Sequence, residues 1–347
     1  MTEVAIAVVG AGLIGRKHIA ALGQSRTARL AAIVDPSPGA ADLAAYLGVP
    51  HVAALGDLTG VAGVILATPT ALHFPQAMDC VARGWPVLVE KPVAVTAAEG
   101  NVLADAADAA GVPVLVGHHR RHNPRIAAAH EALHAGRLGR IISVQASVLL
   151  CKPDDYFAPD WRRAPGAGPL LTNLIHEIDT LRYLLGEVVA VQAVTSNAVR
   201  GFLVEDTAVA LLQFASGTLG TVTVSDAAAA PWSWELTAAE NPDFPPTGQN
   251  CLMIAGTHGA LEVPGLRLWH HGTAPRSWLV PMASEVLSVV DADPLVRQID
   301  HFAAVIRGEV APLVSAKDAT GSVAVVDAIL RASVSGQREE ITKGTTP

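Results

Sequence analysis

Aromatic and charged residues are scarce in this sequence of 347 residues, at 4% and 16% respectively. A disordered chain has few apolar residues and a high net charge, so the hydrophobic content of 50% excludes disorder. With so few aromatic side chains, we expect a core built mainly from Ala, Val, Leu and Ile. The length corresponds to about two domains of average size.

Cysteine is scarce as well. Cys80, Cys151 and Cys251 lie far apart and are odd in number. This arrangement predicts neither a disulfide framework nor a zinc site, and it favours a reducing compartment. We therefore expect a cytoplasmic protein that binds no metal. No run of 18 apolar residues occurs, which predicts that no helix crosses a membrane.

Positive charge is in deficit, because 24 basic residues face 32 acidic ones and the formal net charge is −8. A broad nucleic-acid interface normally requires a basic patch, so this balance argues against nucleic acid as a partner. A small-molecule ligand fits the composition better than a nucleic acid or a membrane surface does.

The first third of the sequence alternates short apolar runs with amphipathic stretches. Apolar runs occur at Val4–Val9, Leu30–Val34, Val61–Ala67, Pro86–Val89 and Val112–Val116. The stretches between them predict helices at Leu13–Leu22, Gly39–Tyr46, Leu72–Arg83 and Thr96–Ala110. Continuous apolar strands that alternate with helices are typical of a doubly wound parallel sheet covered on both faces. The fold class is therefore α/β.

The pattern changes after about residue 123. A helix at Pro124–Ala135 is followed by runs with period-two alternation, which predicts a mostly antiparallel sheet with one covered face. These runs are Ile141–Leu150, Val188–Val199, Thr207–Phe214, Thr218–Val224, Cys251–Ala255 and Leu266–His270. Further helices are expected at Leu170–Leu185, Pro294–Arg307 and Lys317–Ser333. We predict a first domain at 1–122 and a second, α+β domain at 123–347.

The strongest local motif is Gly10-Ala-Gly12-Leu-Ile-Gly15, which follows the first strand and opens a helix. Gly10 permits a tight turn, Gly12 lets the backbone approach a pyrophosphate, and Gly15 allows close packing of helix on strand. Asp35 ends the second strand, where a carboxylate binds the ribose hydroxyls of NAD and repels the 2′-phosphate of NADP. The motif predicts a dinucleotide site with NAD preferred over NADP.

Glu90-Lys91-Pro92 stands at the end of the fourth apolar run. Ligands of open α/β sheets bind at the carboxyl ends of the strands, which would bring Lys91 to a reaction site. A partly desolvated lysine there could exchange a proton with a substrate hydroxyl. A solvated surface lysine that pairs with Glu90 is an equally good interpretation of the position alone.

The helix predicted at Leu170–Leu185 carries polar residues on an apolar background. Asn173 and His176 are three residues apart, and Thr172 and His176 are four apart, so the spacing places them on one helix face. Buried polar groups are costly unless they have partners, so this stripe either lines a site or forms an internal hydrogen-bond network.

The sequence resembles the glucose–fructose oxidoreductase/inositol dehydrogenase (Gfo/Idh/MocA) family in the order and spacing of five features. These are the glycine motif, Asp35, the Thr68-Pro69 turn with His73, Glu90-Lys91-Pro92, and His176. The resemblance covers the whole chain. It implies a Rossmann domain, followed by a domain with a large open antiparallel sheet that carries the substrate and the contacts of a homodimer or homotetramer.

The resemblance also implies roles for individual residues. Lys91 matches the catalytic lysine of the family, and His176 matches the histidine that takes the hydroxyl proton. Many relatives carry Asp four residues before that histidine, whereas this chain has Thr172, so a proton relay of Lys91 and His176 alone is expected. The expected cofactor-binding residues are Gly10, Gly12, Leu13, Ile14, Gly15, Asp35, Thr68, Pro69, His73, Glu90 and Lys91. The expected substrate-binding residues are Asn173 and His176, together with four residues that are expected from their position in the sequence alone: His118, Arg121, Trp161 and Arg162. His118 and Arg121 follow the fifth apolar run at the ligand end of the sheet. Trp161 and Arg162 lie in the loop before the His176 helix, where a solvated loop is an equally good interpretation.

These expectations define an NAD-dependent oxidoreductase. It would interconvert a secondary alcohol and a ketone on a small polyhydroxylated or cyclic substrate such as a sugar, an inositol or a related acid. Two alternatives remain at this point: a hydrolase or lyase of the same fold that retains its NAD, and a non-catalytic NAD-binding sensor.

Overall fold

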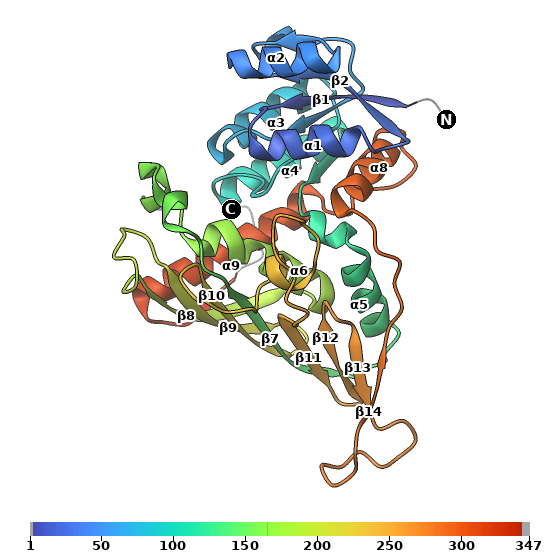
Figure 1. Cartoon of the computed structure of the whole chain (residues 1–347), viewed down its shortest axis with the longest axis vertical. Coiled ribbons are helices and arrows are strands. Elements are labelled where there is room, and N and C mark those ends of the chain that lie inside the picture. The colour runs from blue at the N-terminus through green and yellow to red at the C-terminus, as the bar shows by residue number, and fades with distance from the viewer. Residues whose placement is uncertain (1–2, 165, 342–347) are drawn as a thin grey trace. The chain divides into compact units, whose positions relative to one another are not determined.

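The computed structural model describes residues 3–164 and 166–341, which form two compact units (Figure 1). Of these described residues, the first unit contains those up to His122 together with Ala292–Val323. The second contains those of Asn123–Asp291 and those after Val323. Within the described residues, no helix is long and apolar enough to cross a membrane.

The first unit is built on a parallel sheet of six strands in the order β3-β2-β1-β4-β5-β6. Its strands are β1 (Val4–Val9), β2 (Ala28–Val34), β3 (His51–Val52), β4 (Gly63–Leu66), β5 (Val87–Val89) and β6 (Val114–Val116). The strand order reverses between β1 and β4, which is the position where folds of this kind bind ligands. The predicted Rossmann-type sheet is confirmed, although the short strand β3 escaped prediction.

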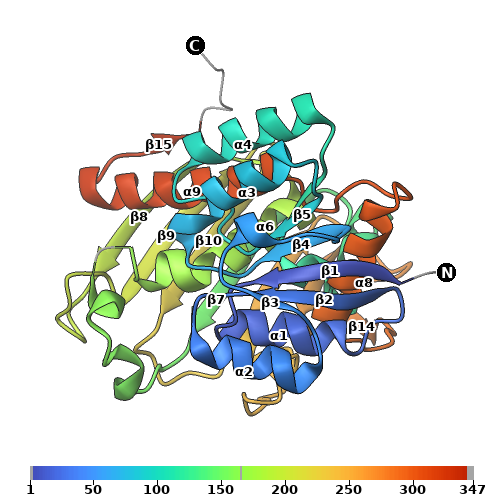
Figure 2. The same ribbon diagram turned by 90° about the horizontal axis from the view of Figure 1, so that it is seen from above.

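Helices flank this sheet on both faces. They are α1 (Leu13–Leu22), α2 (Pro38–Leu47), α3 (His73–Ala82), α4 (Ala97–Ala110) and α8 (Pro294–Ile306), with single turns at Leu55–Asp57, Thr70–Leu72 and His119–His122. Figure 2 shows α3 and α4 on one side of the sheet and α1 and α2 on the other. Local sequence signals explain the helix ends. In α4, for example, Thr96 and Glu99 form a reciprocal capping box and Gly111 takes the left-handed conformation.

The segment that contains α8 packs with the first unit, whereas the predicted division placed everything after residue 122 in one domain. Helix α8 lies against α1 and β2. The close approach is visible at Gly63, where an added Cβ atom would lie 2.5 Å from Ile306. In addition, Asp300 accepts hydrogen bonds of 2.6 Å from Ser25 and Thr27.

The second unit contains a nine-stranded sheet in the order β14-β13-β12-β11-β7-β10-β9-β8-β15. Its strands are β7 (Ile141–Leu149), β8 (Val188–Ser196), β9 (Thr207–Phe214), β10 (Leu219–Ser225), β11 (Leu252–Gly256), β12 (Gly259–Val263), β13 (Arg267–His270), β14 (Ala283–Val286) and β15 (Glu339–Glu340). Strands β7 and β10 pair in parallel and the other neighbours pair antiparallel. This confirms the predicted mostly antiparallel sheet.

Helices α5 (Pro124–His134) and α6 (Ile175–Leu185) pack against each other and against strands of this sheet. The unit also contains the short helix α7 (Trp234–Thr237), single turns at Asp154–Phe157 and Asp160–Arg163, a π-helical turn at Leu170–Leu174, and the end of α9 (Ala316–Ser335). Strand β9 shows the predicted alternation, because Ala210 and Leu212 are buried while Val209 and Leu211 are exposed.

Candidate functional site

The glycine motif has the geometry of a phosphate-binding turn. Gly10 has a φ of +89°, and an added Cβ atom would lie 2.7 Å from the carbonyl oxygen of Ala67. At Gly15 the same atom would lie 1.8 Å from the carbonyl oxygen of Gly10, so the first turn of α1 passes close over the end of β1. A Cβ atom at Gly12 would meet nothing within 4 Å. The backbone is therefore accessible at the N-terminus of α1, where phosphates bind.

Two apolar side chains follow Gly12 and are exposed, Leu13 by 76% and Ile14 by 43%. Within residues 3–164 and 166–341, no side chain caps the N-terminus of α1. The turn thus presents backbone N–H groups and apolar surface side by side, which fits the pyrophosphate and rings of a dinucleotide.

Asp35 lies at the end of β2, beside this turn. Its carboxylate accepts hydrogen bonds of 2.8 Å from the amides of Ala11 and Ser37. Partial burial acts to raise the pKa of Asp35, but these hydrogen bonds outweigh it and the pKa is lowered. The carboxylate is therefore ionised and fixed in place, as the recognition of ribose hydroxyls requires.

His73 connects the turns that follow β4 and β5. Its Nε2 atom lies 2.8 Å from the carbonyl oxygen of Thr68, and its Nδ1 atom lies 2.7 Å from that of Pro92. The ring is buried. His73 thus contacts the backbone of both turns and holds them in a fixed position at the carboxyl edge of the sheet.

Glu90 is buried and makes polar contacts with His18 and with the backbone of Lys91. The sequence did not indicate the contact with His18. His18, on α1, lies with its Nε2 atom 2.7 Å from Glu90 Oε1, and the backbone amide of Lys91 donates to Glu90 Oε2 at 3.1 Å. Burial acts to raise the pKa of Glu90, yet the hydrogen bond and charge of His18 lower it to about 2. Glu90 thereby ties the backbone of Lys91 to helix α1.

Lys91 is the second residue after β5 and is partly exposed. The Lys91–Pro92 peptide bond is cis. In the parallel sheet β5 is next to β4, so Lys91 and Thr68 leave the same edge as the glycine motif. The structure thus brings the predicted cofactor-binding residues of the first unit together at one edge.

The segment after β6, which carries the expected substrate-binding residues His118 and Arg121, is largely buried. His118 is 1% exposed, and the buried Arg121 forms an ion pair of 2.5 Å with Asp318 on α9. His122 lies against His301 of α8 with ring centroids 5.1 Å apart. Arg121 is therefore engaged in the packing of the first unit.

In the second unit, His176 occupies the first turn of α6 and is 8% exposed. The predicted continuous helix from Leu170 differs in detail, because Leu170–Leu174 forms a π-helical turn before the α-helix begins. Such turns are rare and frequently occur at functional sites. Asn173 stands in the wider turn, and Thr172 donates from its hydroxyl to the carbonyl oxygen of Gly168 at 3.0 Å.

Lys152 lies beside this turn and was not predicted. It follows the end of β7, and its Nζ atom is 2.8 Å from Asn173 Oδ1 and 3.4 Å from Thr172 Oγ1. A lysine two residues after the alternating run Ile141–Leu150 was the signal that the sequence offered. Burial lowers the pKa of Lys152, with Asp226 and Glu235 acting in the opposite direction.

Trp161 and Arg162 belong to a helical turn that follows Lys152 in the sequence. Trp161 is 63% exposed. The Arg162 guanidinium lies 4.1 Å from the ring centroid of Tyr156 and donates to the carbonyl oxygen of Tyr156 at 2.6 Å. Tyr156 is a further residue that sequence analysis missed. Two of the four substrate-binding residues expected in this unit thus contact Lys152 or Tyr156: Asn173 contacts Lys152, and Arg162 contacts Tyr156. His176 follows Asn173 by three residues in the sequence.

The chain matches two family models. Residues 4–118 match the model described as "Oxidoreductase family, NAD-binding Rossmann fold", and residues 126–262 match the "GFO/IDH/MocA C-terminal domain". Together these matches cover most of the chain and agree with the two sheets.

Individual proteins are similar to the chain over different spans. It is 34% identical over 191 residues to the rhizopine catabolism protein MocA of Rhizobium meliloti, a match that covers 54% of this chain but only 59% of that relative. It is 27% identical to the scyllo-inositol 2-dehydrogenase (NAD(+)) of Bacillus subtilis, over 92% of this chain and 90% of the relative.

Among solved structures, the WlbA dehydrogenase of Bordetella pertussis in complex with NADH and UDP-GlcNAcA superposes with a TM-score of 0.78. It is 26% identical, and the alignment covers 98% of this chain and 99% of the other. The resemblance stated from the sequence motifs is confirmed. The chain belongs to the Gfo/Idh/MocA oxidoreductase family and carries its NAD-binding Rossmann domain.

Proposed function

We propose that the protein is an NAD-dependent dehydrogenase. It interconverts a secondary alcohol and a ketone on a small polyhydroxylated or cyclic substrate. The observation that carries the proposal is the edge of the first sheet, where an accessible phosphate turn, the fixed carboxylate of Asp35 and Lys91 lie on neighbouring strand ends. Membership of an oxidoreductase family and the named activities of the relatives support it.

The protein's own residues position the substrate and move a proton. The glycine turn and Asp35 would hold NAD, which would supply the hydride acceptor for the substrate carbon. Lys91 and His176 hold the hydroxyl group and take its proton as the carbonyl forms, so the oxygen never carries a full negative charge. Glu90 fixes the backbone of Lys91 relative to α1, because it binds the Lys91 amide and the His18 side chain at the same time.

The test is NADH formation at 340 nm over a panel of inositols, aldoses, polyols and sugar acids, first with NAD and then with NADP. Lys91→Ala and His176→Gln are expected to reduce kcat strongly while NADH still binds, as measured by fluorescence titration. Lys317→Ala is the matched control because Lys317 is an exposed lysine of the same unit. Unchanged kcat in Lys91→Ala would overturn the assignment.

The same assay separates the alternatives. An enzyme that retains NAD and recycles the hydride within each turnover would convert substrate without accumulating free NADH. A sensor would bind NADH and turn over no compound of the panel. Net NADH formation with wild-type protein would exclude both.

We also propose that the open face of the second sheet associates with a second copy of the chain, as a homodimer or homotetramer. Val194 and Val209 are paired neighbours on this face and are 72% and 46% exposed, and Leu211 and Leu219 are 51% and 60% exposed. The residues that share this face in β7 to β10 are uncharged, so a two-fold axis would bring no like charges together. Leu211→Lys should dissociate the oligomer in light-scattering measurements, and an unchanged mass would contradict this interface.

A further inference from the structure

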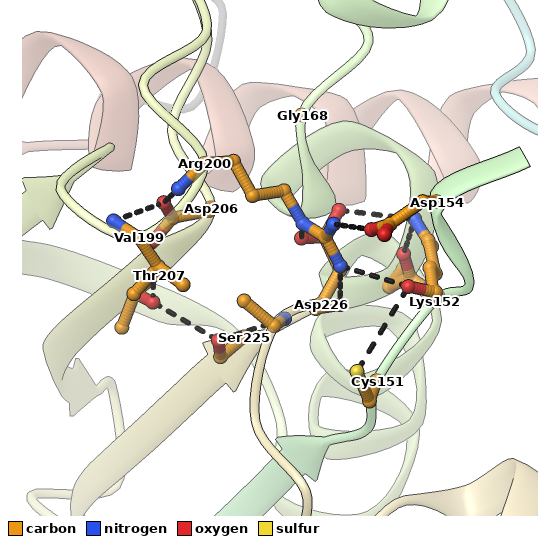
Figure 3. A network of polar contacts seen from close by, with 12 residues as sticks. Cys151, Lys152, Asp154, Gly168, Val199, Arg200, Asp206, Thr207, Ser225 and Asp226 are labelled. Atoms are coloured by element: carbon orange, nitrogen blue, oxygen red, sulfur yellow. Dashed lines mark hydrogen bonds and ion pairs between the residues drawn. The ribbon is translucent and has the colours of Figure 1, made fainter. Parts of the chain in front are cut away.

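Lys152 is held in a buried network of charges in the second unit (Figure 3). Its backbone amide donates to the carbonyl oxygen of Asp226 at 2.8 Å, and its Nζ atom lies 3.5 Å from Asp226 Oδ2. Arg200 is closer to the same carboxylate, with Nε 3.0 Å from Oδ1. The ammonium group is therefore fixed in place, while Asp226 pairs mainly with Arg200.

This network also decides how the Asn173 amide is oriented. Asn173 Oδ1 lies 2.8 Å from Lys152 Nζ and 2.9 Å from Thr172 Oγ1. Lysine can only donate, so the atom facing it must be the amide oxygen. The Nδ2 group consequently points elsewhere, and no acceptor binds it within the part of the chain that the structure describes. Asn173 presents a hydrogen-bond donor.

A second cation lies beside the same aromatic ring. Lys152 Nζ is 4.9 Å and the Arg162 guanidinium carbon is 4.1 Å from the ring centroid of Tyr156. In the described residues no carboxylate pairs with Arg162, and its Nε atom is buried without a hydrogen-bond partner. The adjacent Arg163, by contrast, is paired with Asp160.

We propose that Arg162, Lys152 and the Nδ2 group of Asn173 form a subsite for a carboxylate of the substrate. The inference rests on the proposed function and narrows its substrate class to hydroxy acids. All three groups donate hydrogen bonds and none accepts one. A carboxylate only accepts, and charge-assisted bonds to it are stronger than those between neutral groups, whereas a hydroxyl group would leave its own donor unused.

The test compares matched pairs of compounds that differ in the carboxylate, namely D-gluconate with D-sorbitol and D-glucuronate with D-glucose. Initial rates of NADH formation give KM and kcat. In parallel, calorimetry measures binding of the two acids to the enzyme–NADH complex. The variants are Arg162→Ala, Lys152→Met and Asn173→Asp, and Arg163→Ala is the matched control because it removes a neighbouring guanidinium that already has a partner.

Wild-type protein should prefer the acid of at least one pair. Loss of one charge-assisted contact should weaken acid binding by about 10- to 100-fold in Arg162→Ala and Lys152→Met. Asn173→Asp should weaken it by a similar factor, because a negative charge replaces the donor. NADH affinity should not change, the KM of the neutral compound should rise much less than that of the acid, and Arg163→Ala should behave like wild type.

Several outcomes would overturn the subsite: equal affinity for acid and neutral compounds, no binding of either acid, or equal effects of Arg162→Ala and Arg163→Ala. If the acids bind to the wild type and not to Arg162→Ala, yet no compound reduces NAD, the subsite stands and the proposed function fails. The same set of variants therefore distinguishes failure of the carboxylate subsite from failure of the proposed dehydrogenase function.

Discussion

The contact between His18 and Glu90 provides a quantitative test of how the first unit holds the sheet edge that carries Lys91. Glu90 is 9% exposed and His18 is fully buried. In the folded protein the pKa of Glu90 falls from its usual 4.5 to about 2, because His18 outweighs the opposing effect of burial. A difference of this size corresponds to about 3 kcal/mol of folding free energy. The contribution is present above pH 4.5 and is lost as the pH falls towards 2.

The perturbation is His18→Leu, which leaves the Glu90 carboxylate buried without its partner. Removing one member of a buried pair typically costs about 3–5 kcal/mol. Glu90→Gln should cost less, and the double variant should be more stable than the sum of the two losses predicts, since it buries no unpaired charge. The expected coupling energy at pH 7 is about 2–3 kcal/mol.

Because the two units need not unfold together, the assay should report on the first unit alone. Hydrogen exchange of peptides from β1 and β5, followed by mass spectrometry under native conditions, measures the opening free energy of that sheet. The kcat of His18→Leu should also fall, since the backbone of Lys91 loses its connection to α1. Single-variant losses that add within about 0.5 kcal/mol would refute the reasoning.

Three further predictions concern the same unit. Gly15→Ala should destabilise the unit by about 2 kcal/mol or more, because its Cβ atom would lie 1.8 Å from the carbonyl oxygen of Gly10. Gly12→Ala should keep wild-type stability, because its Cβ atom would meet nothing within 4 Å, and should still weaken NADH binding in a fluorescence titration. Asp35→Ser should raise NADP affinity by about tenfold relative to NAD, and unchanged relative affinities would contradict the assigned ribose contact. Burial, aided by nearby cationic groups, lowers the pKa of His122 to about 3. The stability of the folded protein should therefore fall as the pH drops from 6.5 towards 3. Thermal melts of His122→Phe should show a weaker dependence of stability on acid pH.

Sequence periodicity predicted most of the elements whose burial follows a simple pattern, although it missed the short alternating strand β12. Strand β1 is almost wholly buried and reads as a continuous apolar run, while β9 alternates buried and exposed residues along its length. The glycine motif was equally accessible, because the tight turn at Gly10 and the close packing at Gly15 each require the absence of a side chain. Such constraints are local and are therefore visible in a sequence.

Elements without a local apolar pattern escaped prediction. Strand β14 is exposed at every position, and β3 and β15 have two residues each, so they form only because a neighbouring strand offers hydrogen bonds. The return of α8 to the first unit was also not predictable. Its contacts join residues far apart in sequence, such as Ser25 and Asp300, and helix amphipathicity does not show which sheet a helix will cover.

The candidate site shows the same limit at the level of single side chains. His18 and Lys152 are polar residues next to buried structure, and burial of such groups is costly unless partners satisfy them. That rule predicts that each has a partner, but not which one: His18 meets Glu90 across 72 residues, and Lys152 meets Asn173 across 21. Each partner lies next to or near a predicted catalytic residue, Glu90 directly before Lys91 and Asn173 one turn before His176. In the proposed mechanism, buried polar residues of this kind fix the geometry of the groups proposed to react. Their importance in that mechanism follows from the fold and not from any motif.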